Sequence, residues 1–208
     1  MQRFRKKESL KKMRMDEQGL VLRIQEGDEI AFGEIVRIYK DKIVNYLCQL
    51  TGDYQKAVEL SQETFMRVYF KAHKYRPIAP FSSWVYAIAS NLAKTELKKM
   101  NKIPTVPLDL VQNRIPETRL SNDHSDSDLA KDLRKALNSL HPRYKIPVIL
   151  KDIEGFSQEE IAQVLKKPLG TIKARISRGR DYLKKELEKS CGEINFLMNE
   201  KEKEYGRV

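Results

Sequence analysis

The sequence predicts an all-α protein of two helical domains joined by a flexible linker, with a helix-turn-helix in the C-terminal domain. Three observations support this fold class. Apolar residues recur at helical spacing through most of the chain, whereas strand signals are scarce. A proline-interrupted stretch, residues 101–127, separates two such regions and is typical of an interdomain linker. Residues 156–187 contain two short helical patterns around a tight turn, and the second is rich in cations.

The overall composition narrows the class of partner. The chain has 208 residues and a formal net charge of +11, which favours an anionic partner, nucleic acid ahead of an acidic protein or a membrane surface. It contains no run of 18 apolar residues, so we expect no membrane span. Residues 1–15 are basic but lack the apolar core of a secretory signal, and are expected to form a disordered arm. With only two cysteines and no disulfide framework, the sequence predicts a cytoplasmic protein.

The first domain is expected to span residues 16–100. Asp28 is a good cap for a helix that ends near residues 51–53. The predicted core face of that helix consists of Ala31, Phe32, Ile35, Tyr39, Ile43, Tyr46, Leu47 and Leu50. A second helix is expected to bury Ala57, Leu60, Thr64, Phe65, Val68 and Tyr69. After a proline-containing break at residues 75–80, a third helix is expected to bury Trp84, Val85, Ile88, Ala89 and Leu92.

The second domain is expected to span residues 128–190 and to be followed by a disordered charged tail, residues 191–208. Its first helix carries an apolar stripe of Leu129, Leu133, Ala136, Leu137 and Leu140. Pro142 is suited to a helix start, whereas Pro147 falls inside an apolar run and predicts a kink or a late start. The helix-turn-helix closes this domain.

The helix-turn-helix is predicted residue by residue. Ser157 and Glu160 have the spacing of a capping box, and the segment around Pro168 breaks the first helical pattern. The second helix is expected to bury Ile172, Ile176, Leu183 and Leu187 and to present Lys173, Ala174, Ser177 and Arg178 on the opposite face. Residues 166–189 contain nine Lys or Arg against three Asp or Glu, a net charge of +6. The alternative is an amphipathic surface helix with solvated lysines.

Two longer motifs resemble a known family. The first motif is LTGDYQKAVELSQETFMRVY followed by KYRPIAPFSSWVYAIASNLAK. It resembles region 2 of the bacterial extracytoplasmic-function (ECF) sigma factors, which are members of the sigma-70 family. Region 4 of the same family is similar to GFSQEEIAQVLKKPLGTIKARISRGRDYL. The resemblance covers roughly residues 20–187. It implies a protein that binds core RNA polymerase, recognises the minus-ten and minus-thirty-five promoter elements and helps to open the DNA.

The resemblance also implies three sets of site residues. Core polymerase would be bound through Glu59, Gln62, Glu63 and Met66. The minus-ten DNA would be bound through Tyr75, Arg76, Ser82, Asn91, Lys94 and Lys98, of which Asn91 suits a base edge and the two lysines suit phosphates. The minus-thirty-five element would be bound through Thr171, Lys173, Ala174, Arg175, Ser177, Arg178 and Arg180. Within that last set, Lys173, Ala174, Ser177 and Arg178 would face base edges, whereas Thr171, Arg175 and Arg180 would hold phosphates.

Alternatives remain open for several of these residues. The four polymerase-binding residues could be solvated helix surface, Asn91 could cap or bridge helices, and Phe81 and Trp84 suit the core better than a stacking platform. Three departures from the family stand out. Val58 occupies a position that is often acidic in relatives. Ala174 occupies a position that is usually small and polar, and Lys166 occupies one that often carries Gly or a short polar residue. If the turn needs a positive φ at Lys166, lysine adopts it at some cost in free energy.

The resemblance further implies an anti-sigma factor as a partner, commonly membrane-anchored in relatives, and a protein that is no enzyme itself, because catalysis stays with the polymerase. No metal-ligand spacing and no Walker-type or GxGxxG loop occurs in the sequence, which agrees with that reading, so we expect neither a cofactor nor a bound metal. One alternative is a free-standing helix-turn-helix regulator that binds an operator without polymerase. A second is a nucleic-acid-processing enzyme, which would need a carboxylate cluster or metal ligands.

Overall fold

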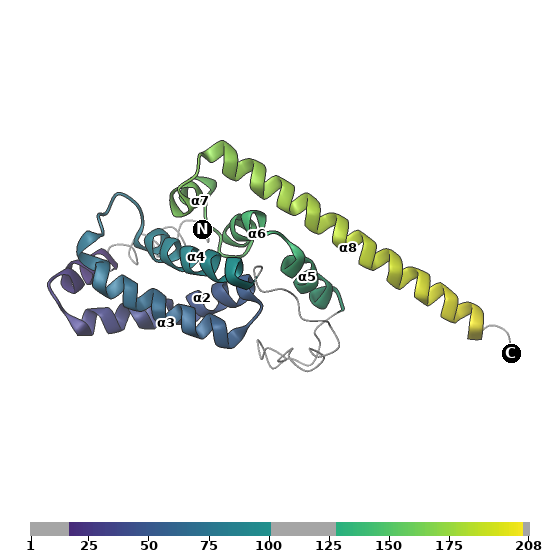
Figure 1. Cartoon of the computed structure of the whole chain (residues 1–208), viewed down its shortest axis with the longest axis horizontal. Coiled ribbons are helices and arrows are strands. Elements are labelled where there is room, and N and C mark those ends of the chain that lie inside the picture. The colour runs from purple at the N-terminus through teal and green to yellow at the C-terminus, as the bar shows by residue number, and fades with distance from the viewer. Residues whose placement is uncertain (1–16, 101–127, 206–208) are drawn as a thin grey trace, which may run out of the picture.

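The structure, a computed structural model, describes residues 17–100 and 128–205, and this part of the chain is helical with no strand (Figure 1). Residues 17–25 form a short helix. The longer helices are α2 (Glu29–Thr51), α3 (Tyr54–Lys71), α4 (Phe81–Met100), α5 (Asp128–Ser139), α6 (Pro142–Val148), α7 (Gln158–Leu165) and α8 (Leu169–Tyr205). The all-α prediction is therefore confirmed. The predicted arm, residues 1–15, and the predicted linker, residues 101–127, lie outside the described residues.

Helices α2, α3 and α4 pack on one another and form the first domain. The Asp28 carboxylate accepts hydrogen bonds from the backbone N–H groups of Ile30 and Ala31 at 2.9 and 3.0 Å, which begins α2 where the sequence predicts. Helix α2 ends at Gly52, whose φ of 73° suits glycine. The predicted core faces are buried, except that Phe32, Tyr69, Trp84 and Ile88 are only half-buried.

Helices α5 to α8 form the second domain. Pro147 lies inside α6, and the chain continues as a π-helical segment, Ile149–Ile153, in which the Glu154 N–H donates to the Ile149 carbonyl at 3.0 Å. Leu133 corrects the predicted stripe, since its side chain is 40% exposed. It lies at the rim of a hollow beside Leu183 and Leu187 of α8, so α8 covers only one side of α5.

The C-terminal tail also differs from the prediction. The sequence predicts a disordered segment from residue 191, but α8 continues without a break to Tyr205 and projects beyond the other helices (Figure 1). The residues after Gly192 include Glu, Lys, Leu and Met, which are good helix formers, and no proline follows. High charge was therefore a poor indicator of disorder at this position.

The two domains are in contact, which the sequence does not predict. Helix α4 packs against α7, and α6 packs against α2 and α4. The buried Lys145 ammonium donates to the Leu50 carbonyl at 2.9 Å and to Asn138 Oδ1 at 3.0 Å. The Tyr86 hydroxyl donates to Glu154 Oε2 at 2.5 Å. The centroid of the Tyr86 ring lies 4.8 Å from that of Phe156, so both polar and aromatic contacts join the domains.

Candidate nucleic-acid interface

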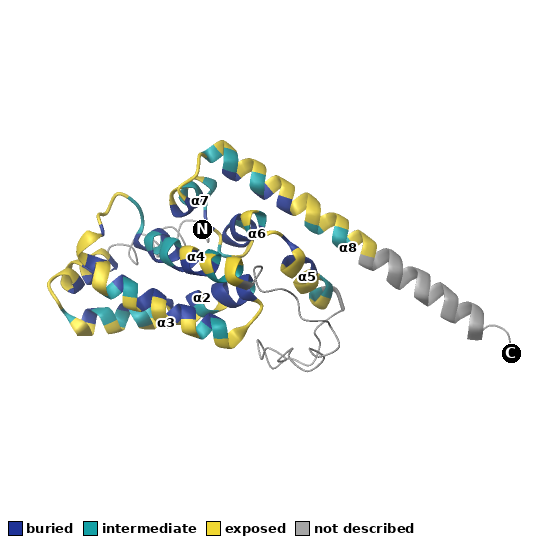
Figure 2. Ribbon diagram, viewed as in Figure 1, coloured by how far each residue is buried: buried dark blue, intermediate teal, exposed yellow. Residues whose placement is uncertain are grey.

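The first helix of the helix-turn-helix begins with hydrogen bonds that the sequence predicts. Ser157 Oγ accepts from the Glu160 N–H at 3.1 Å, and the Ser157 N–H donates to Glu160 Oε2 at 2.9 Å, which completes the capping box. Helix α7 ends at Lys166, whose φ of 51° and ψ of 52° are left-handed. Ile161, Ile172 and Ile176 are buried between the helices. Because these three fix the rotation of α8, its opposite face is directed to solvent (Figure 2).

The residues predicted to face base edges lie together on that exposed face. Lys173, Ala174, Ser177 and Arg178 are exposed, whereas Thr171 and Arg175 beside them are half-buried. Arg180 is exposed, but its guanidinium binds the Asp152 carboxylate through Nη2 to Oδ1 and through Nε to Oδ2, the latter at 3.0 Å. This contact, foremost the hydrogen bond, raises the pKa of Arg180. Its charge is therefore shared with an acid of the same domain.

A hollow next to this face contains two residues that sequence reasoning missed. It is lined by Arg143 and Tyr144 from the start of α6 and by Gly170, Thr171, Ala174, Arg175 and Arg178 from α8. The signal in the sequence was an adjacent basic and aromatic residue directly after a helix-starting proline. Helical periodicity alone could not show that this pair lies beside α8.

In the loop before α4, the structure separates the predicted minus-ten residues. Arg76 is exposed, whereas Tyr75 is buried, contrary to its expected place at a DNA surface. The Tyr75 hydroxyl donates to the Ala79 carbonyl at 2.7 Å, and its ring centroid lies 5.4 Å from those of Phe81 and Trp84. Burial is the main cause of its raised pKa. In this structure Tyr75 shapes the loop, and the exposed apolar residue at the loop is Ile78, which the sequence reading did not select.

On α4 itself, Asn91 and Lys98 are exposed and Ser82 is half-buried. Lys94 is also half-buried, and its pKa is lowered first by desolvation and then by the charges of Arg175, Lys167 and Lys98. Two of those cations belong to the helix-turn-helix. Within the described residues, Lys94, a predicted minus-ten cation, thus lies near Arg175, a predicted minus-thirty-five cation, and near Lys167.

The predicted polymerase-binding residues share one exposed face of α3. Glu59, Gln62, Glu63 and Met66 are all exposed. Lys56 pairs with Glu59 at 2.6 Å and Arg67 pairs with Glu63 at 2.5 Å, so both acids are partly neutralised by cations of their own helix. The hydrogen bond to Glu59 is the main cause of the raised pKa of Lys56.

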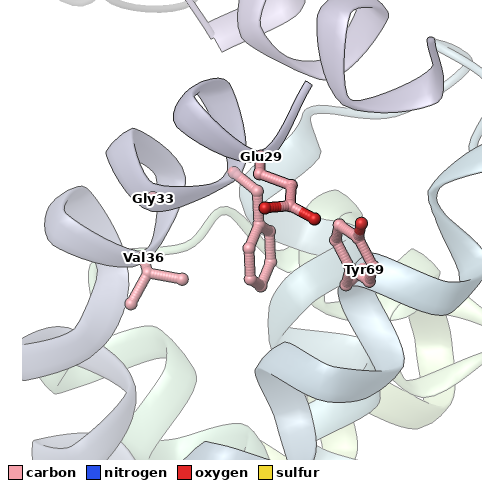
Figure 3. A pocket seen from close by; sticks show the side chains of 5 residues that line it. Glu29, Gly33, Val36 and Tyr69 are labelled. Carbon is pink, nitrogen blue, oxygen red and sulfur yellow. The ribbon is translucent and has the colours of Figure 1, made fainter. Parts of the chain in front are cut away.

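This face continues into an apolar hollow that the sequence reading also missed. The hollow, about 480 Å³, lies between α2 and α3 and is lined by Glu29, Phe32, Gly33, Val36 and Tyr69. Figure 3 shows Glu29, Val36 and Tyr69 around it. Phe70 and Ile30 nearby in sequence are 67% and 74% exposed. Large apolar side chains left in solvent at one end of a helix pair are typical of an interaction surface.

Two kinds of site are absent from the described residues. Within residues 17–100 and 128–205, no group of three or more His, Cys, Asp or Glu residues is arranged to hold a metal ion. No helix in the same ranges is both long enough and apolar enough to cross a membrane.

Comparison with known proteins identifies the class of both domains. Residues 35–103 match the family described as Sigma-70 region 2, and residues 130–183 match Sigma-70, region 4. The chain therefore combines region 2 and region 4 of the sigma-70 class. It is 36% identical over 172 residues to the ECF RNA polymerase sigma factor SigE of Mycolicibacterium smegmatis, covering 80% of this chain and 66% of that protein. It is 32% identical over 178 residues to the ECF RNA polymerase sigma factor SigW of Bacillus subtilis, covering 80% of this chain and 94% of that protein.

The particular family follows from these matches: the chain belongs to the ECF sigma factors, a family of transcription initiation factors. The family assignment supports a sigma factor over a free-standing helix-turn-helix regulator. Two solved structures share the fold. CnrH in complex with the cytosolic domain of CnrY has a TM-score of 0.62 at 18% identity, covering 83% of this chain and 97% of that one. RpoE of Bartonella quintana in complex with the anti-sigma factor NepR has a TM-score of 0.58 at 25% identity, covering 76% and 96%.

Proposed function

We propose that this ECF sigma factor binds core RNA polymerase through α3 and contacts the minus-ten and minus-thirty-five elements through α4 and α8. It directs initiation to those promoters and helps to open the DNA, while catalysis stays with the polymerase. The observation that carries this proposal is the exposed face of α3 in a chain that also presents an outward-facing recognition helix. A free-standing regulator would need only the second of these surfaces.

The α3 face has the composition of a protein interface. Glu59, Glu63 and Met66 follow one another at intervals of four and three residues, and Tyr69 and Phe70 extend the row to the apolar hollow. The two acids are held by exposed ion pairs within α3, and exposed ion pairs contribute little to stability, so a cation of a partner can replace the intrahelical one at little cost. The exposed apolar side chains at the end of α3 supply apolar surface, and burial of such side chains usually contributes most of the binding energy.

The minus-ten surface is proposed to consist of the exposed loop and the solvent-facing residues of α4. Arg76 and Lys98 suit phosphates, and Asn91 suits a base edge. Tyr75 supports the loop from beneath through its bond to Ala79. Lys94 is half-buried at the side of α4 near the helix-turn-helix, and α4 packs against α7, so a change in that packing would make Lys94 more accessible to DNA.

We also propose that an anti-sigma factor controls this protein. The Bartonella quintana RpoE structure holds the anti-sigma factor NepR, and that structure has the fold described above. A membrane-anchored inhibitor would suit a sigma factor that acts in the cytoplasm, where RNA polymerase is found. The apolar hollow between α2 and α3 offers one place for an inhibitor helix.

The test is an initiation assay with the full chain, core RNA polymerase and a promoter library. We expect sequence-specific initiation that depends on the protein, and we expect Met66→Glu to lower it by weakening polymerase binding. Glu34→Gln, on the half-buried edge of α2 away from this row, is the matched control and should leave initiation unchanged. Specific duplex binding without any association with polymerase would overturn the proposal in favour of the free-standing regulator.

The same assay separates base readers from phosphate holders. Arg178→Ala should weaken promoter use by about 1–3 kcal/mol and relax preference at one base. Arg180→Ala should weaken all promoters to a similar and smaller extent, because its guanidinium is shared with Asp152. Identical shifts in the preferred sequence for both variants would contradict this division.

A further inference from the structure

A cluster of four cations lies where α4 meets the helix-turn-helix. Lys94 and Lys98 are four residues apart on α4 and therefore share one face of that helix. Lys167 lies in the turn between α7 and α8, and Arg175 lies on α8. Helix α4 packs against α7, and this packing brings cations of the two domains together. Lys94 is half-buried there, within electrostatic range of the other three.

The four cations are not balanced by ion pairs in the part of the chain that the structure describes. Within residues 17–100 and 128–205, none of their side chains pairs with a carboxylate. Glu96, the nearest acid on α4, is paired instead with Lys99 at 3.6 Å. Burial lowers the pKa of Lys94, and the neighbouring charges that lower it further are those of the other three cations. The cluster is therefore a concentration of positive charge at the contact between the domains.

Repulsion within this cluster opposes the contact between the domains. Charges that are partly buried are screened less by salt than charges in open solvent, so the repulsion at Lys94 is not fully screened. The bond from the Tyr86 hydroxyl to Glu154 and the bond from Lys145 to the Leu50 carbonyl hold the domains together against it. An anion bound among the cations would remove the repulsion. Because a ligand shifts an equilibrium toward the state that it binds better, such an anion favours the closed arrangement of the two domains.

A chain of linked phosphates suits this cluster better than a single anion does. Guanidinium and ammonium groups both bind phosphate oxygens, and several cations can be neutralised only by a ligand with several charges. Arg175 also lines the hollow of about 430 Å³ between α6 and α8, which leaves open space beside the cluster. Lys94 is half-buried at the contact between the domains, where a small ion reaches it more easily than a DNA duplex.

We propose that Lys94, Lys98, Lys167 and Arg175 bind a small ligand with several linked phosphates, and that the bound ligand holds the two domains together. With the ligand in place, Lys94, Lys98 and Arg175 are not available to promoter phosphates, so the ligand inhibits initiation. This consequence for initiation rests on the function proposed above, whereas the binding site does not.

The first experiment is a calorimetric titration of the full chain with inorganic tripolyphosphate at constant ionic strength. We expect one site, with much weaker binding of orthophosphate. Lys94→Gln should weaken tripolyphosphate binding by about tenfold, as the loss of a charge-assisted contact does. Lys99→Gln removes the same charge from the same helix, but Lys99 is paired with Glu96, so this control should bind as wild type does. Equal weakening by both variants, or equal affinity for orthophosphate, would indicate a general effect of net charge and overturn the proposal.

The second experiment tests whether the site needs both domains. Glu154→Ala removes the acceptor of the Tyr86 hydroxyl, and with it one bond between the domains, but it also removes a negative charge. A site within one domain would bind tripolyphosphate more tightly in this variant, because the net charge increases. A site shared by both domains should bind it several-fold more weakly, because fewer molecules are closed. Tighter or unchanged binding would contradict the proposal, and thermal unfolding checks that the variant remains folded.

Titration with adenosine triphosphate distinguishes two sources of the linked phosphates. Affinity equal to that of tripolyphosphate supports a site for inorganic polyphosphate, and tighter binding supports a site for a nucleotide, provided that Lys94→Gln weakens either one. Binding that does not depend on Lys94 would contradict both. Initiation by wild type without added polyphosphate separates this proposal from the proposed function. Its absence contradicts the proposed function, whereas normal initiation by a protein that does not bind tripolyphosphate contradicts only the polyphosphate site.

Discussion

Lys166 determines how the chain turns between the two helices of the helix-turn-helix. It is the one non-glycine residue with positive φ among the residues that the structure describes. Its N–H donates to the Gln163 carbonyl at 3.3 Å, and the N–H of Lys167 donates to the Ala162 carbonyl at 3.0 Å, so both close the end of α7. Left-handed backbone costs an L-residue about 1–2 kcal/mol, which the capping bonds and the buried isoleucines offset.

We therefore expect Lys166→Gly to raise the free energy of unfolding by about 0.5–1 kcal/mol, since glycine adopts this backbone freely but loses more entropy on folding. Urea unfolding measures the change. Lys167→Gly is the control, because Lys167 does not have a positive φ and glycine there should lower stability. If both variants lower stability equally, backbone strain at Lys166 is not significant.

At the scale of elements, the contact between α6 and α8 depends on Gly179. Alanine favours a helix over glycine by about 1 kcal/mol, but its methyl group would lie 2.6 Å from Val148 Cγ2, and Val148 is buried. Gly179→Ala should therefore destabilise the protein by about 1–3 kcal/mol, as overpacking does. Thermal unfolding measures this, with Gly170→Ala in the same helix as the unhindered control.

A double variant completes that test. Val148→Ala opens a cavity by itself, but combined with Gly179→Ala it should recover part of the loss, because the added methyl group then fills the vacated space. Strict additivity of the two losses would show that the residues do not contact each other in the way that the structure indicates.

Helix ends and faces were predictable from the sequence where local chemistry decides them. The cap at Asp28, the capping box and the buried isoleucines of the helix-turn-helix could be predicted from residue spacing and from the hydrogen-bonding groups of the side chains. The burial of Tyr75 was not predictable, because it depends on Phe81 and Trp84 packing back onto the loop. Periodicity identifies the apolar face of each helix but does not show which helix packs against that face. The exposure of Leu133 could therefore not be predicted.

The candidate site was predictable to the same extent. Repeats of three and four residues along α8 placed Lys173, Ser177 and Arg178 on its exposed face. They could not show that Arg143 of α6 stands beside them or that Asp152 holds Arg180, because both contacts depend on how distant segments pack.

At the scale of the whole molecule, the contact between the domains includes a buried ammonium. Lys145 is 3% exposed and bonds to Leu50 of α2, and burial lowers its pKa to about 8. Removing a charge from water is costly even where hydrogen bonds remain, so the protonated form weakens the folded state. The contact is thus stronger when Lys145 is neutral.

This predicts a pH dependence with a definite sign. Because the folded pKa of about 8 lies below the unfolded value of 10.5, the unfolded chain binds more protons between them and stability rises with pH. From pH 8 to pH 10, the free energy of unfolding of wild type should rise relative to Lys145→Met by roughly 1–2 kcal/mol. Urea unfolding of both proteins at several pH values measures the difference; a constant or falling difference would contradict the assignment.

The continuity of α8 has a mechanical consequence. A helix of 37 residues is roughly 55 Å long, and its first turns form the recognition helix. The helix has no break between the groove-facing residues and Tyr205 (Figure 1). If α8 tilts about its first turns, the end at Tyr205 is therefore displaced farther than the end at the DNA. A partner that binds near Tyr205 would therefore tilt and rotate the recognition helix without contacting any residue that binds the promoter.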